Sequence, residues 1–214
     1  MQLPARVEVC EVGPRDGLQN EAANVPTADK IRLIEALAQT GVRRMEATSF
    51  VAPKWIPKLA DAGEVLAGIR RQPGVAYAAL VPNIKGLERA LAAKVDEAVI
   101  FLSASETHSQ KNINKSSAEA LETYLEVAAR AKQAGLRLKG AISTCFGCPY
   151  AKGATGNVAT EDLVHMLHEM GIETGMDLER LIECAKLAQD LVGRPLEGHV
   201  AKAGPVNHTR LVGA

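Results

Sequence analysis

The chain has 214 residues, enough for one domain of ordinary size, and its composition excludes an intrinsically disordered protein. Hydrophobic residues make up 47% of the chain and charged residues 23%, so a sizeable core can be buried. Lysine plus arginine equals aspartate plus glutamate at 25 each, which argues against a partner such as nucleic acid or a membrane surface.

Neither a membrane span nor a leader peptide is expected. No apolar run approaches the roughly 18 residues of a spanning helix, and the first strand begins by Val7, which leaves no room for a leader. Four cysteines are few for this length and predict a reduced, cytoplasmic protein. Cys145 and Cys148 have CxxC spacing, but no second ligand pair accompanies them, so a zinc or redox site is the less favoured interpretation.

Strand and helix patterns alternate along the first 142 residues. Runs of apolar and β-branched residues predict strands over Val7–Val12, Arg44–Thr48, Val75–Leu80, Ala98–Leu102 and Leu138–Ile142. Helical spacing and caps predict helices from Thr27 to Gly41, over Asp61–Arg71 and Asn83–Ala93, and from the capping box at Ser116 to Gly135. Five strand–helix repeats with short links predict an α/β fold with a parallel sheet and right-handed crossovers.

The alternation stops after Tyr150. A loop of small residues over Ala151–Asn157 leads to two predicted helices, from Ala159 to Met170 and over Asp177–Leu191. Proline, glycine and histidine are frequent after that point. We therefore expect a single domain over residues 1–192 and a loose tail over residues 193–214.

The segment VEVCEVGPRDGLQNE places charged groups directly after the first strand. The strand breaks at Gly13-Pro14, and Arg15, Asp16 and Gln19 follow. Enzymes with parallel α/β folds carry their chemistry at the C-terminal ends of strands. The arginine can polarise a carbonyl or hold an anion, and the aspartate can bind a divalent metal or a proton. A salt-bridged surface turn is the structural alternative, since such ion pairs are common.

Five segments, in order, resemble the hydroxymethylglutaryl-CoA lyases, a metal-dependent family built on the (β/α)8 TIM barrel. They are PRDGLQNE, EATSFVAPKWIP (46–57), SETHSQKNIN (105–114), GCPY (147–150) and AKGATGNVATEDLVHML (151–167). The resemblance implies retro-Claisen cleavage of 3-hydroxy-3-methylglutaryl-CoA to acetoacetate and acetyl-CoA, as in leucine degradation and ketone body metabolism. It also implies an acyl-CoA substrate and Mg²⁺ or Mn²⁺ as cofactor, and it is compatible with a homo-oligomer.

The resemblance also implies a role for several side chains. Asp16 and Asn157 match two oxygen ligands of the metal. Arg15 matches the cation that stabilises the enolate oxygen and contacts the substrate. Cys148 matches a loop thiol that takes part in proton transfer, and Glu46 a catalytic carboxylate near the site. Taken singly, most of these would be ordinary turn, ion-pair or buried residues, and only their joint occurrence favours a site.

Four further residues are expected around this centre. Glu161 matches a residue that supports the loop and the helix after it. Gln19 is assigned to substrate binding. Lys111 and Asn112, in a segment expected to be a polar loop, either contact the phosphates of CoA or cap the next helix.

One departure from the family is large. The family has GCPY twice, after the fifth strand and in the loop after the eighth, whereas this chain has it once. The residues before it resemble the approach to the first copy, and those after it resemble the exit from the second. This indicates the loss of a block on the order of 90 residues, with strands six to eight, from a barrel of ~250 residues or more.

The family's His-x-His metal pair lies in that block, and no two histidines here are one residue apart. His165 and His168 share a helix face but are expected to be partly exposed, and His108 is expected in a solvated or substrate-lining loop. We therefore expect a partial barrel of about five strands, an exposed strand edge, Asn157 far from Asp16, and impaired activity. The alternatives are a related metal-dependent aldolase or acyl-CoA condensing enzyme, and a non-catalytic remnant that binds CoA or a full-length partner.

Overall fold

The centre of the molecule is a sheet of five parallel strands in sequence order. The structure is a computed structural model that describes residues 3–145 and 157–206. The strands are β1 (Cys10–Glu11), β2 (Arg44–Ser49), β3 (Ala76–Leu80), β4 (Glu97–Ser103) and β5 (Arg137–Ser143). This topology confirms the α/β fold and the partial barrel of five strands predicted from the sequence.

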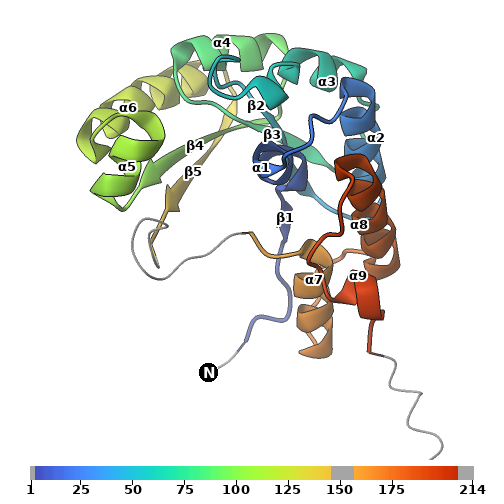
Figure 1. Cartoon of the computed structure of the whole chain (residues 1–214). Helices are drawn as coiled ribbons and strands as arrows, with labels where there is room; N and C mark the ends of the chain where they lie inside the picture. Colours follow the sequence, from blue (N-terminus) through green and yellow to red (C-terminus); the bar gives the residue numbers. More distant parts are fainter. Residues whose placement is uncertain (1–2, 146–156, 207–214) are drawn as a thin grey trace, which may run out of the picture.

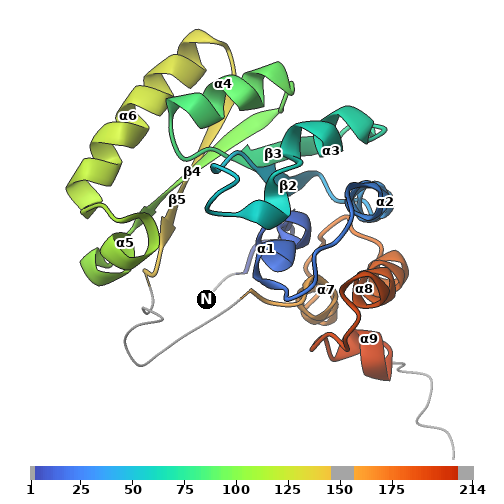
Figure 2. The ribbon, with the colours of Figure 1, turned by 45° about the horizontal axis from the view of Figure 1, so that its top comes forward.

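Helices on one side of the sheet connect the strands. The connecting helices are α2 (Thr27–Ala38), α3 (Ala62–Gly68), α4 (Ile84–Ala92), α5 (Glu106–Ile113) and α6 (Ser117–Gln133). Short turns η1 (Gly13–Gly17) and α1 (Leu18–Asn20) follow β1, η2 (Pro57–Leu59) follows β2, and α7 (Thr160–Glu169), α8 (Leu178–Val192) and α9 (Val200–Ala203) end the chain. Figures 1 and 2 show α2, α3, α4 and α6 in an arc along the sheet, with α8 beside α2. Within the described part of the chain, no helix combines the length and apolarity needed to cross a membrane.

The middle strands β2 and β3 are buried on both faces, as parallel strands covered by helices normally are. Met45 and Tyr77 are their largest fully buried side chains. Ile34 of α2, Leu87 of α4 and Val127 of α6 complete the core above them. Each such side chain stabilises the fold by roughly 1.5–3 kcal/mol when it leaves water. The core therefore holds the ends of β1 and β2, where the predicted site lies, in a rigid frame.

The two edges of the sheet differ. β5 pairs with β4 over all seven of its residues, and no strand of the described ranges pairs with its other side. This confirms the expected exposed parallel edge. At the other edge β1 has only two paired residues, fewer than the predicted Val7–Val12. Instead, Val7 N donates to Glu173 O at 2.9 Å, so the loop after α7 covers part of that edge.

Two segments are more regular than the sequence indicates. The sequence predicts a polar loop over 105–114, but α5 forms there because Ser105 Oγ caps it at His108 N and Asn114 ends it at φ 53°. A loose tail is expected after Gly193, but α9 packs there with Val200 buried. Asp162 accepts a hydrogen bond from Val200 N at 2.7 Å and so joins the tail to α7. Local caps therefore order the first segment, whereas a contact between distant residues orders the second.

Gly41 fixes how the C-terminal helices meet the first half of the chain. Its φ is +85°, a left-handed conformation, and an added Cβ would meet the carbonyl oxygen of Gly175. Next to it, Asp177 N donates to Thr40 O at 2.7 Å. The start of α8 is thereby held against the end of α2.

Candidate active site

A largely buried ion pair joins the turn after β1 to the middle of β2. Arg15 Nε and Nη2 both donate to Glu46 Oε2, at 2.9 and 2.6 Å. Glu46 is only 4% exposed. The register between β2 and β3 shifts between Glu46 and Thr48, and such a bulge re-aims the side chains beside it. The guanidinium is therefore held in one orientation by charge-assisted hydrogen bonds, as expected for groups clustered at strand ends.

Asp16 connects this pair to a distant part of the chain. Its Oδ1 accepts from Arg15 Nη1 at 2.5 Å, and its Oδ2 accepts from Asn157 Nδ2 at 2.7 Å. From the sequence we expect Asn157 far from Asp16, because the family resemblance indicates that strands are missing between them; that expectation is wrong. α7 packs on α8 and α8 on α2, so the residue just before α7 comes to lie beside the turn after β1.

Lys139 is a member of this cluster that the sequence did not reveal. Its Nζ lies 3.4 Å from Glu46 Oε1 and 3.6 Å from Cys10 Sγ. Burial raises the pKa of the Cys10 thiol, and the nearby ammonium of Lys139 opposes that rise. The sequence did contain a signal for it. Alternate residues of a strand point to opposite faces, so a lysine between Leu138 and Ile142 in the predicted fifth strand points away from the face of these two apolar residues.

Gln19 and Glu161 lie close to this cluster in different ways. Gln19, in α1, has a buried Oε1 with no hydrogen-bond partner among the residues that the structure describes. Such an oxygen can accept a donor from a ligand. Glu161 is buried at the start of α7, against Gly198, and burial raises the pKa of its carboxyl. Glu161 is therefore placed to fix the helix that follows Asn157.

The other predicted residues lie elsewhere. Lys111 and Asn112 are exposed on α5 rather than in a loop. His108, on the same helix, has Nδ1 3.1 Å from Ser103 Oγ. Cys148 lies outside the described residues.

The chemistry of the donor set allows a test of the divalent metal that the family resemblance implies. A half-turn of the Asn157 amide exchanges Nδ2 for Oδ1, which turns the 2.7 Å contact into two oxygen donors facing one ion. Adjacent ligands of an octahedral Mg²⁺ are about 3.0 Å apart, and Mg²⁺ keeps several waters. Asp16 and Asn157 therefore fit such an ion with two protein ligands. No group of three or more His, Cys, Asp or Glu suited to a metal occurs in residues 3–145 and 157–206.

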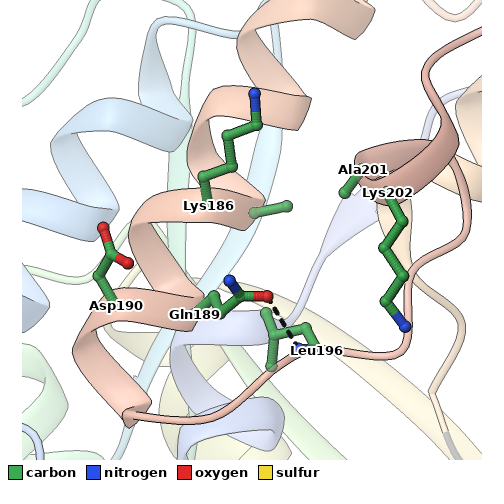
Figure 3. Close-up of a pocket in the computed structure, with 7 residues that line it drawn as sticks. Lys186, Gln189, Asp190, Leu196, Ala201 and Lys202 are labelled. Carbon is green, nitrogen blue, oxygen red and sulfur yellow. Dashed lines mark hydrogen bonds between the residues drawn. The ribbon is translucent and has the colours of Figure 1, made fainter.

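A cavity of about 440 Å³ lies apart from this cluster, between α8 and α9 (Figure 3). Lys186, Asp190 and Lys202 are the charged residues that line it, and Gln189 Oε1 accepts a hydrogen bond from Leu196 N at 3.2 Å. None of its lining residues belongs to the Arg15 cluster. It is a hollow formed where the segment after α8 folds back on that helix.

Parallel strands with charged side chains gathered at their C-terminal ends define an α/β-barrel enzyme. Residues 6–155 match the model of the HMGL-like family. A hydroxymethylglutaryl-CoA lyase of Bacillus subtilis is 36% identical in an alignment that spans 288 residues of length, and that covers 92% of this chain and 96% of the relative. This chain belongs to the HMGL-like family, that of the hydroxymethylglutaryl-CoA lyases, which are carbon–carbon lyases.

Solved structures agree with this placement. The crystal structure of the Bacillus subtilis lyase is similar with a TM-score of 0.90 and 35% identity, over 94% of this chain and 98% of that one. A lyase of Acinetobacter baumannii in complex with coenzyme A and 3-methylmalate is similar with a TM-score of 0.88 and 29% identity, over the full length of both chains.

Proposed function

We propose that this chain is a hydroxymethylglutaryl-CoA lyase of low activity, which cleaves 3-hydroxy-3-methylglutaryl-CoA to acetoacetate and acetyl-CoA. The observation that carries the proposal is the 2.7 Å contact between Asp16 and Asn157, residues 141 positions apart. It adjoins the Arg15–Glu46 ion pair. A metal donor set and a cation for an enolate oxygen thus lie side by side, as retro-Claisen cleavage requires.

The substrate must lose the proton of its tertiary hydroxyl, break a carbon–carbon bond and leave a thioester enolate. Arg15 has five N–H donors, of which Glu46 and Asp16 take three, which leaves two to bind the enolate oxygen. Glu46 Oε2 orients the guanidinium, and Lys139 contacts the other oxygen of the same carboxylate. We propose that Gln19 takes part in substrate binding, which its buried Oε1 without a hydrogen-bond partner in the described residues supports. Cys148 is the residue proposed to move a proton to or from the leaving carbon.

Mg²⁺ or Mn²⁺, when bound, would acidify the substrate hydroxyl. Asp16 and Asn157 would hold the ion. With these two protein ligands, and without the His-x-His pair of the family, we propose that metal binding is weak and that turnover is impaired for this reason. Glu161 supports the Asn157 end of the site by anchoring the start of α7.

We also propose that the chain lacks an internal block that the family carries. An alignment of 288 residues with a chain of 214 supports this, as does the free edge of β5. We propose an acyl-CoA as the substrate. We also propose a cytoplasmic location, which the low cysteine count supports.

The test is a coupled assay of acetyl-CoA release from 3-hydroxy-3-methylglutaryl-CoA, with Mn²⁺ titrated into the protein in parallel. We expect turnover well below about 1 per second and weak Mn²⁺ binding, with both lost in Asp16→Asn. Asp190→Asn, which removes an exposed carboxylate of α8, is the matched control and should change neither. Turnover at or above about 1 per second would overturn the impairment.

The small number of metal ligands in the described residues favours one other function, a non-catalytic remnant that binds CoA. The same experiment separates the two. Binding of CoA without acetyl-CoA release and without an effect of Asp16→Asn would support the remnant and refute the lyase.

A further inference from the structure

α6 lies beside β5 at one side of the sheet (Figures 1 and 2), and both elements carry exposed apolar side chains. These residues, Leu121, Leu125, Leu138 and Ile142, are 47%, 61%, 37% and 65% exposed. The two leucines of α6 are four residues apart and share a helix face, and the two residues of β5 share one face of the strand. We call these four residues the β5–α6 edge. Exposed apolar side chains gathered on two neighbouring elements are typical of a site of interaction.

The strand that borders this surface also offers unpaired backbone. β5 is seven residues long and pairs with β4 on one side. The free N–H and C=O groups of such an edge are a template for another strand. The β1 edge is a poor template, because it has two paired residues and Arg6 beside it already forms a bridge with Glu173.

We propose that a second copy of this chain covers the β5–α6 edge, with the two β5 strands antiparallel about a twofold axis at Gly140. Lys139 faces Glu46 inside the curved sheet, so Leu138, Gly140 and Ile142 point to the helix side. An axis at Gly140 places Leu138 of each copy opposite Ile142 of the other. Lys139 then lies opposite Ala141, whereas an axis at Lys139 would oppose two like charges.

The size of the surface suits a dimer. Given their exposed fractions, the four side chains present roughly 400 Å² of apolar area, about half of the ~800 Å² that each partner buries in a standard interface. Pairing of two seven-residue strands adds backbone area. The twofold axis also brings the two α6 helices side by side on the same face of the joined sheet, where Leu121 and Leu125 lie. A self-complementary patch of this kind is the feature of an isologous dimer.

The first test is the mass of the full chain in solution, measured by sedimentation from ~1 to ~100 µM. We expect a monomer–dimer equilibrium that Ile142→Lys weakens at least tenfold, because two lysines would enter an apolar interface. Trp55→Lys changes a 72% exposed apolar side chain elsewhere and is the matched control, with no expected effect. Circular dichroism of both variants checks that the fold is kept, as the exposure of both side chains predicts.

A second test locates the axis. Gly140→Cys, made with Cys145→Ser and Cys148→Ser, brings two thiols to a Cα separation of ~4.5–5.5 Å, within reach of a disulfide. An added Cβ at Gly140 meets nothing within 4 Å. Mild oxidation should give a covalent dimer, and none for Ala67→Cys on α3 in the same background. A monomer at all concentrations, or a dimer that Ile142→Lys leaves intact, overturns the interface. A dimeric Gly140→Cys variant that does not cross-link overturns the axis.

Discussion

The Arg15–Glu46 ion pair allows a sharp test of what holds the candidate site together. Glu46→Ala removes the acceptor of two Arg15 hydrogen bonds and the ion-pair partner of Lys139, and leaves Asp16 as the carboxylate that binds Arg15. Removing one partner of a buried ion pair costs about 3–5 kcal/mol. Arg15 is 16% exposed and keeps Asp16, so we expect about 3 kcal/mol of lost unfolding free energy. For a chain of this length that lowers Tm by roughly 6–12 °C.

Urea denaturation at one fixed protein concentration measures this loss, since self-association would change the apparent stability. Glu35→Ala is the matched control, because Arg70 Nε and Nη2 also bind Glu35, but at the surface with Arg70 89% exposed. That control should change the unfolding free energy little. A loss for Glu46→Ala no larger than for Glu35→Ala would refute the view that burial of the pair stabilises the site.

Three further predictions concern stability and reactivity. Gly41→Ala should lower the free energy of unfolding, measured by thermal denaturation, by about 3 kcal/mol, because backbone atoms fill the position of the added Cβ. Gly74→Ala has nearly the same φ but an open Cβ position, so it should lower the free energy of unfolding by about 1 kcal/mol. Burial raises the pKa of Glu161, so the folded protein favours the protonated carboxyl. The stability that this residue contributes is therefore present at low pH and is lost as the pH rises through the folded-state pKa. Glu161→Gln, which stays neutral, should raise Tm relative to the unchanged protein more at pH ~8 than at pH ~4. Burial raises the pKa of Cys184 to about 12, so at pH ~8 iodoacetamide should label Cys184 far more slowly than the exposed Cys145, as read by peptide mass spectrometry.

Several features of the protein follow from the sequence alone because they depend on local patterns. Alternating strand and helix signals predict the five parallel strands, and Ser116 with Glu119 predicts the capping box that starts α6. The charged turn after the first strand predicts that Arg15 and Glu46 cluster, and the two side chains do meet. These predictions succeed because hydrogen bonding within a helix, and the direction of parallel strands, are set within short stretches of chain.

Other features were decided only by tertiary packing. Asn157 reaches Asp16 because α7, α8 and α2 stack in sequence and carry it across the molecule, which no periodicity encodes. Lys139 joins Glu46 because the curvature of the sheet turns the inner face of β5 toward β2. Ile142 remains exposed because no further strand pairs with β5 among the described residues. Contacts between distant segments depend on how whole elements pack, and that geometry is set by the complementary shapes of all their buried side chains together.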